Sequence, residues 1–271
     1  MSEQVVAPPT GWDETRNIVA VTLSRVGAFC LVELQKLRHD RTELFTRAVQ
    51  PVLWVTIFGT TFSRIHAIPT GTISYLSYMA PGVIAQSALF VAIFYGIQII
   101  WERDAGILAK LLVTPTPRVA LVTGKAFAAG VRAVAIAMVV IVVALFMRIE
   151  MTWNPLRWLA VFGVVMLGSA FFCCLSLTIA GIVLHRDRLM GIGQAITMPL
   201  FFASNALYPT QIMPGWVKAL ATVNPLSYEV QMMRGLLLGQ PTDYLHDLAV
   251  LVCAVVVMIV VASSLLGRLS R

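Results

Sequence analysis

The sequence predicts an all-α, multi-pass membrane protein with six transmembrane helices, an N-terminal interfacial helix and short re-entrant helices between the fifth and sixth spans. Apolar residues make up 58% of the 271 residues and charged residues only 12%, with a mean hydropathy of +0.83. An ordinary soluble domain carries about twice that share of charge. The apolar stretches are continuous rather than alternating, which favours helices over a β-barrel.

The N-terminal region is expected to stay on the cytoplasmic side of the membrane. Residues 1–16 are polar and lack the basic start and short apolar run of a secretory signal, so we expect a cytoplasmic tail. Residues 17–44 predict an amphipathic interfacial helix, because Arg25 and Glu33 interrupt the apolar run up to about Lys36 and would be costly in a span. A seventh span at this position is the alternative.

Residues 45–271 predict the six-helix transmembrane domain. A spanning helix needs roughly 20 mainly apolar residues, and the first predicted span is short, with Pro51 near its start. The second and third predicted spans carry rows of small residues at four-residue spacing, which let helices approach closely: Ala88, Ala92 and Gly96, then Ala129, Ala133 and Ala137. The expected spans cover residues 45–62, 73–100, 119–146, 158–184, 189–207 and 248–266.

The lysines and arginines orient these spans. Excess Lys and Arg mark the cytoplasmic side, and placing both termini inside gives fourteen basic residues in the internal segments against five outside. The net charge of +7 is therefore expected to serve topology and lipid headgroups rather than nucleic acid. The internal set is Arg16, Arg25, Lys36, Arg38, Arg41, Arg47, Arg103, Lys110, Arg118, Lys125, Arg186, Arg188, Arg268 and Arg271; the external set is Arg64, Arg148, Arg157, Lys218 and Arg234.

The predicted spans contain little reactive chemistry. They hold no acidic residue, the four histidines lie in loops or at ends, and Arg132 is the only charge well inside a span. A proton-coupled transporter usually carries an intramembrane carboxylate or His relay, and a hydrolase needs a nucleophile with a base or a metal cluster. Gly124-Lys125 fails the phosphate-loop pattern, because Val119 and Ala126 stand where Gly and Ser or Thr are needed. We therefore expect no catalytic residue, metal or cofactor in this chain.

The loop after the second predicted span predicts a short amphipathic helix in the cytoplasm. Apolar residues recur at helical spacing from Ile107 to Leu112, acidic residues precede them, and Pro115 and Pro117 stop the helix. The helix could rest on lipid or fill a groove in a soluble partner. The sequence from Glu102 to Thr114 leaves both interpretations open.

A second segment, residues 208–246, is apolar but broken by prolines, so it cannot be one spanning helix. We expect two short re-entrant or interfacial helices on the outer face, with Trp216 and Tyr228 at headgroup level. A lid over a pathway and a simple anchoring loop are the two interpretations. The residues concerned are Pro209, Pro214, Trp216, Asn224, Pro225, Tyr228 and Arg234.

Together these segments resemble the type-2 permeases of the ABC transporter superfamily, the group with drug-resistance, antibiotic-export and polysaccharide- or lipid-export permeases. The resemblance rests on Glu-Arg-Asp-x-Gly-x-Leu-x-x-Leu-x-x-Thr-Pro after the second span and on Tyr-Pro, Met-Pro-x-Trp, Asn-Pro-Leu-Ser-Tyr and Arg-Gly after the fifth. Asp104 stands where Glu is commoner, and the first span is short.

This resemblance implies a permease in the plasma (inner) membrane of a prokaryote that pairs with a second permease subunit, identical or related. Two cytoplasmic ATP-binding subunits would supply ATP and Mg and receive a coupling helix at 102–114, with the N-terminal helix beside it. The implied coupling residues are Glu102, Arg103, Asp104, Gly106, Ile107, Leu108, Leu111 and Leu112. The implied pathway residues, which could equally be ordinary packing residues, are Gln86, Phe90, Phe94, Met198, Phe201, Phe202 and Asn205.

The leading functional prediction is therefore multidrug-type efflux, the ATP-driven export of an amphipathic, drug-like or lipid-linked compound. A self-contained channel or secondary transporter is the alternative, and a membrane-embedded enzyme lacks a visible reactive cluster.

Overall fold

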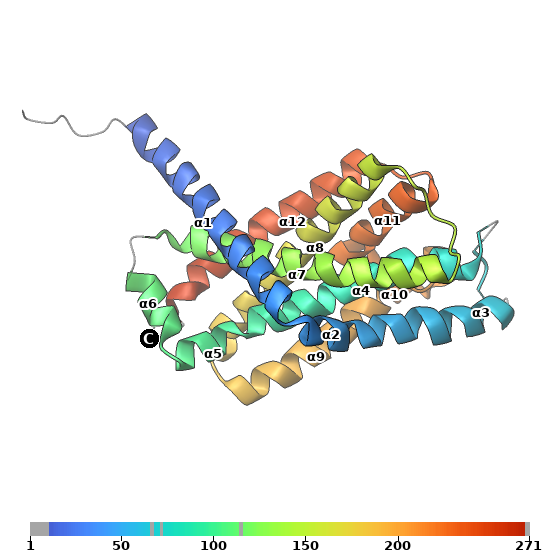
Figure 1. Cartoon of the computed structure of the whole chain (residues 1–271), viewed down its shortest axis with the longest axis horizontal. Coiled ribbons are helices and arrows are strands. Elements are labelled where there is room, and N and C mark those ends of the chain that lie inside the picture. Colours follow the sequence, from blue (N-terminus) through green and yellow to red (C-terminus); the bar gives the residue numbers. More distant parts are fainter. Residues whose placement is uncertain (1–10, 66–67, 71–72, 114–115, 269–271) are drawn as a thin grey trace, which may run out of the picture.

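The computed structural model describes residues 11–65, 68–70, 73–113 and 116–268, which form one elongated helical bundle (Figure 1). Most of the predicted tail, together with His66, Thr114, Pro115 and Arg271, lies outside the described residues. The helices are α1 Gly11–His39, α2 Arg41–Leu53, η1 Trp54–Gly59, α3 Thr60–Ile65, α4 Tyr75–Ile97, α5 Ile99–Asp104, α6 Ile107–Val113, α7 Arg118–Phe146, α8 Pro155–Val183, α9 Arg186–Phe202, η2 Thr210–Ile212, α10 Gly215–Val223, α11 Pro225–Leu238, α12 Tyr244–Leu265 and η3 Leu266–Arg268.

Four of the predicted spans correspond to helices that are long and apolar enough to cross a membrane: Tyr75–Asp104, Arg118–Phe146, Pro155–Val183 and Tyr244–Arg268. The other two predicted spans are also helical, as the α2–η1–α3 rod and α9. The rod is interrupted by the π-helix η1, which begins three residues after Pro51, and α9 has 17 residues. A six-span topology therefore stays a prediction.

The two rows of small residues, which were predicted to let helices approach closely, lie in the bundle interior. Ala88, Ala92, Ala129, Ala133 and Ala137 are fully buried. A Cβ atom added to Gly96 of α4 would lie 2.7 Å from the Cβ atom of Ser176 of α8, so these two helices are in close contact. The Ser176 hydroxyl donates a hydrogen bond to the carbonyl oxygen of Ile93 across the same contact, at 2.7 Å.

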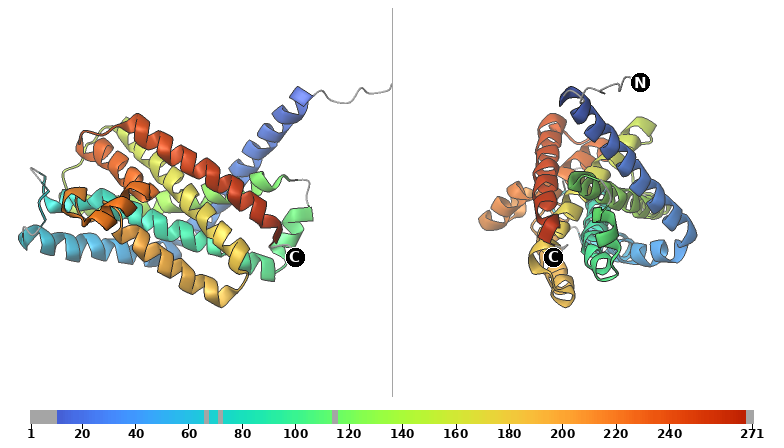
Figure 2. Two further views of the ribbon diagram at one scale, coloured as in Figure 1. Left: turned by 180° about the vertical axis from the view of Figure 1, so that it is seen from behind. Right: turned by 90° about the vertical axis from the view of Figure 1, so that its left-hand side faces the viewer.

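The two ends of the bundle carry different elements. Helices α5 and α6 and the C-terminal end of α12 lie at one end, whereas α3 lies at the other (Figures 1 and 2). The N-terminal part of α1 projects away from the bundle, while its C-terminal part packs against α7 (Figure 1). Helix α1 ends at His39, and Asp40 caps α2 by accepting a hydrogen bond from the Glu43 amide at 3.0 Å. The predicted single helix over 17–44 is thus two helices with a boundary at Asp40.

The prediction of a single helix over 102–114 is also wrong, because the structure divides this segment between α5 and α6. Glu102, Arg103 and Asp104 extend the long α4–α5 rod, and the chain turns at Ala105 and Gly106 before α6 begins at Ile107. Gly106 has a φ of +71°, a left-handed conformation that glycine adopts without steric cost. The acidic residues therefore end one helix instead of starting the next.

Candidate functional site

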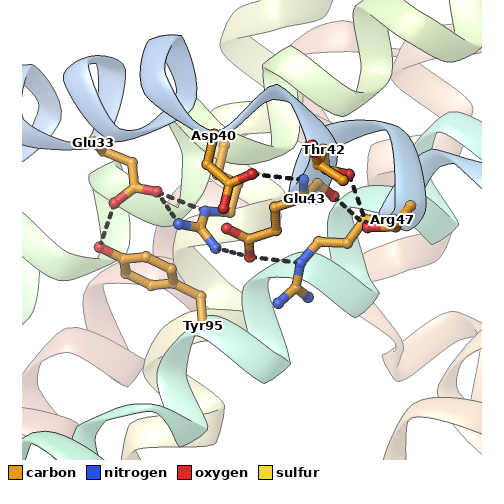
Figure 3. A network of polar contacts seen from close by, with 8 residues as sticks. Glu33, Asp40, Thr42, Glu43, Arg47 and Tyr95 are labelled. Atoms are coloured by element: carbon orange, nitrogen blue, oxygen red, sulfur yellow. Dashed lines mark hydrogen bonds and ion pairs between the residues drawn. The ribbon is translucent and has the colours of Figure 1, made fainter.

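A charged network joins the N-terminal helices to the bundle (Figure 3). Its centre is Arg132 of α7, whose Nε and Nη2 atoms lie 2.6 and 2.5 Å from the Oε1 atom of Glu33 of α1. The Nη1 atom of Arg132 donates to Glu43 of α2 at 2.7 Å, and Glu43 also accepts from the Nε atom of Arg47 at 2.9 Å. Arg132, the one charge predicted inside a span, thus faces neighbouring helices.

The network continues through Tyr95 of α4 toward α5. The Tyr95 hydroxyl donates to Glu33 at 3.1 Å, and the Cζ atom of Arg132 lies 5.2 Å from the ring centroid. The Nζ atom of Lys125, on the same helix as Arg132, lies 5.6 Å from that centroid and 2.6 Å from the Oε1 atom of Glu102. One aromatic ring therefore links two ion-pair groups, one at α1 and α2 and the other at α5.

Three members of this network are buried, so their ion pairs are expected to affect the free energy of unfolding. Glu33 is 1% exposed, Lys125 4% and Arg132 6%. A buried charge requires a partner, since removing one member of a buried pair costs about 3–5 kcal/mol. Sequence reasoning missed Glu33, Tyr95 and Lys125 as partners, although an arginine inside a predicted span implies a nearby counter-charge.

The short helix α6 divides its apolar residues between two sides. Leu108 is 1% exposed and joins the bundle core, whereas Ile107 is 49% and Val113 88% exposed. Leu111 and Leu112 are partly buried against the core. Arg103 pairs with Asp104 at 2.9 Å and donates to the Leu184 carbonyl oxygen at 3.2 Å, which ties α5 to the end of α8.

The predicted pathway residues do not gather in one cavity. Gln86, Phe90 and Phe94 line a cavity of about 150 Å³ between α2 and α4, and neither polar atom of the buried Gln86 amide has a partner among the described residues. Phe201 is fully buried, Phe202 is 42% exposed, and both rings contact Trp54. Met198 is partly buried on α9. Asn205 lies apart from these and lines a different cavity.

The predicted external segment forms two short helices, α10 and α11, attached by side-chain hydrogen bonds. Asn224 caps α11, and its amide nitrogen donates to the carbonyl oxygens of Leu200 and Ala203 at 2.6 and 3.2 Å. Pro225 occupies the first turn of α11, where a missing amide hydrogen is tolerated. The hydroxyl of Tyr208 bonds the carbonyl oxygen of Phe202, and that of Tyr228 bonds Thr222 at 2.6 Å.

The remaining predicted residues of this segment take different positions. Pro209 precedes η2 and Pro214 caps α10, while Trp216 of α10 is 70% exposed. Arg234 of α11, one of the basic residues counted in the external segments, is buried inside the bundle at 4% exposure.

Two carboxyl groups that lie outside the predicted spans are nevertheless buried in the structure. Glu229 of α11 is fully buried with both oxygens unpartnered among the described residues, and it packs against Gly168 of α8. Asp247 lies inside α12 and is 3% exposed. Helix α11 is outside the four candidate spans, and burial raises the pKa of Glu229 well above its ordinary value.

Comparison with known proteins places these features in a family. The model of the ABC-2 type transporter family matches residues 26–238. The chain is 26% identical to ycf38 of Cyanophora paradoxa, named as a transport permease, over 73% of this chain and 69% of that protein. It is 23% identical to the daunorubicin resistance ABC transporter permease protein DrrB1 of Streptomyces coeruleorubidus, over 86% and 81% of the two chains. It is 26% identical to DrrC of Mycobacterium tuberculosis, named as a doxorubicin resistance ABC transporter permease, over 89% and 86%.

Proposed function

We infer the function from one premise: the chain belongs to the ABC-2 type transporter family. It is a multi-pass membrane protein and the permease component of an ABC exporter. We propose that it exports an amphipathic, drug-like or lipid-linked compound across a prokaryotic inner membrane, driven by cytoplasmic ATP-binding subunits and paired with a second permease. In this proposal six spans cross the membrane and both termini are cytoplasmic.

The observation that carries the coupling proposal is the exposed apolar side of α6. Ile107 and Val113 point away from the bundle, while Leu108 anchors the helix in the core. An exposed apolar helix face is the surface that a groove in a soluble partner covers. Charges on Leu108 would disrupt the fold, so Ile107 is the residue that separates partner binding from folding.

The test uses the chain purified from its native membrane. We expect it to co-purify with a protein that contains a phosphate loop, and the complex to hydrolyse ATP. Ile107→Glu should reduce co-purification at least tenfold, because a charge would be desolvated in the groove, and should leave membrane insertion unchanged. The matched control is Leu220→Glu, since Leu220 is 51% exposed and belongs to α10, a helix that lies away from the end of the bundle that carries α6 (Figure 1). Equal recovery of the ATPase with both variants would refute the coupling role of α6.

One observation favours the alternative function, a secondary transporter. It is the buried carboxyl group of Glu229. Proteoliposomes distinguish the two functions. An ABC permease reconstituted without its ATPase should move no substrate along an imposed proton gradient. A secondary transporter should do so, and Glu229→Gln should abolish that movement.

A further inference from the structure

A polar cavity of about 490 Å³ lies between α4, the turn after α9, and α11. Its lining combines Tyr78, Asn205, Thr210, Gln231, Arg234 and Gln240 with neighbouring prolines and threonines, and no acidic residue is among the described residues that line it. The volume lies within the range of about 300–1,000 Å³ that ligand pockets usually have. The α6 helix and the charged network lie elsewhere in the bundle.

Arg234 is the charged group of this cavity, and it is 4% exposed. Its Nε atom donates to the Tyr78 carbonyl oxygen at 3.2 Å, and its Nη2 atom donates to those of Asn205 and Ala206 at 2.6 and 3.1 Å. The Cζ atom lies 3.6 Å from the centroid of the Tyr78 ring. These contacts fix the guanidinium group but use neutral partners alone.

Arg234 differs from the other buried cations in having no counter-charge. Lys125 pairs with Glu102 at 2.6 Å, and Arg132 pairs with Glu33 and Glu43 at 2.5 and 2.7 Å. In the described part of the chain, no carboxylate lies within ion-pair distance of Arg234, and its Nη1 atom has no hydrogen-bond acceptor. Carbonyl dipoles and an aromatic face reduce the cost of burying a cation but leave its charge uncompensated.

A second buried polar group of the cavity is also unsatisfied. The Oδ1 atom of Asn205 is buried without a partner among the described residues. Amide oxygen and nitrogen positions are interchangeable by a flip of the side chain, so Asn205 can present a donor to a ligand. The cavity thus joins a fixed cation, an unsatisfied amide and the polar side chains of Thr210, Gln231 and Gln240.

We propose that this cavity binds the phosphate group of a phosphate ester or of free phosphate, with Arg234 as the anchoring cation. The Nε and Nη2 atoms of Arg234 are held by carbonyl oxygens, which leaves the N–H groups of Nη1 to donate to phosphate oxygens. Hydrogen bonds between a charged donor and a charged acceptor are roughly twice as strong as neutral ones. The cavity has room for a phosphate together with a small headgroup, and its amides and hydroxyl groups supply additional donors. The ligand can come from a lipid headgroup or from solution, because both present the same anion. This site does not depend on ATP coupling.

The test places a negative charge in the lining without altering the contacts of Arg234. Gln231 lines the cavity but is exposed, so Gln231→Glu should fold normally. The matched control is Lys218→Gln, which changes the charge by the same unit at an exposed position of α10 outside the lining. Binding is measured by thermal-shift titration of the purified chain in a phosphate-free maltoside detergent. The probes are inorganic phosphate, dihexanoyl phosphatidylglycerol and dihexanoylglycerol.

We expect the chain to bind the phosphatidylglycerol, inorganic phosphate or both, and to bind dihexanoylglycerol at least tenfold more weakly. Binding of the lipid probe alone identifies a headgroup as the source, and binding of inorganic phosphate identifies free phosphate. Gln231→Glu should weaken binding at least tenfold, whereas Lys218→Gln should change it less than twofold. Equal affinity for the two lipid probes, binding of none, or an unchanged affinity in Gln231→Glu would overturn the proposal. Since no ATPase takes part, these results are independent of the test at α6.

Discussion

The buried ion pair between Arg132 and Glu33 is predicted to hold α1 on the bundle. In Arg132→Met, Glu33 would keep the Tyr95 hydroxyl at 3.1 Å as its hydrogen-bond donor while remaining 1% exposed. A carboxylate left in that position loses its counter-charge but not its desolvation cost. We therefore expect Arg132→Met to lower the free energy of unfolding by about 3–5 kcal/mol.

A double-mutant cycle separates the ion pair from general packing. Glu33→Met should destabilise the chain by a smaller amount, since Arg132 keeps Glu43 as an acidic partner. The double variant removes both desolvation costs, so its loss should be smaller than the sum of the two single losses by at least about 2 kcal/mol. The exposed pair of Arg103 and Asp104 is the control. Its side chains are 28% and 43% exposed, and Asp104→Asn should cost less than about 1 kcal/mol.

The assay is reversible unfolding in mixed micelles with increasing SDS, combined with maleimide labelling of Cys30 on α1. Cys30 is half-buried, and Cys253 is exposed and must first be replaced by alanine. We expect faster labelling of Cys30 in Arg132→Met and wild-type labelling in the double variant. Additive losses in the cycle, or an Arg132→Met variant within about 1 kcal/mol of the wild type, would refute this account.

Two further predictions concern buried positions. The raised pKa of Glu229 means that the folded chain binds this proton more tightly than the unfolded chain does. As the pH rises from the ordinary pKa toward the raised pKa, the free energy of unfolding of the wild type therefore falls by about 1.4 kcal/mol per pH unit. Glu229→Gln should therefore be at least as stable as the wild type at pH 7 in SDS unfolding, with a difference that shrinks toward pH 4; a difference that grows on acidification would contradict this. Gly96→Ala should lose about 1–3 kcal/mol against Ser176 in the same assay, whereas Gly163→Ala, with open space around the added Cβ atom, should gain up to about 1 kcal/mol.

Hydrophobic pattern predicted the helices better than their ends. Long apolar stretches gave the four candidate spans, because continuous apolar runs leave few alternatives to a helix. The breaks at Asp40 and Gly106 were missed, since a capping side chain or a left-handed glycine interrupts a helix without interrupting its apolar periodicity. The short amphipathic helix after the second predicted span was predicted from the spacing of its apolar residues, and that spacing cannot separate the buried Leu108 from the exposed Ile107.

The polar interior was the part that the sequence could not predict. Glu33 was placed in an interfacial helix, and Glu229 and Asp247 were placed outside the predicted spans. All three are buried, because α1, α11 and α12 pack against the bundle. Arg234 was counted among the basic residues of the external segments, and that count did not predict its burial. Counting the charged residues of each loop predicts which side of the membrane the loop lies on. It does not predict whether a charged side chain is buried, because that depends on which helices pack around it.

The charged network connects α5 to α1, and it could therefore transmit a displacement of α5 to α1. Glu102 is joined to Lys125, Lys125 and Arg132 share the Tyr95 ring, and Arg132 is joined to Glu33. Lys125 and Arg132 both belong to α7. A shift of α5 that pulls Lys125 along the axis of α7 must therefore also move Arg132, or else break the ion pair between Lys125 and Glu102 or the one between Arg132 and Glu33. Breaking the pair to Glu33 is costly, because Glu33 is buried. We therefore expect α5, α7 and α1 to move together, and a disulfide or crosslink between α1 and α7 to leave that motion intact.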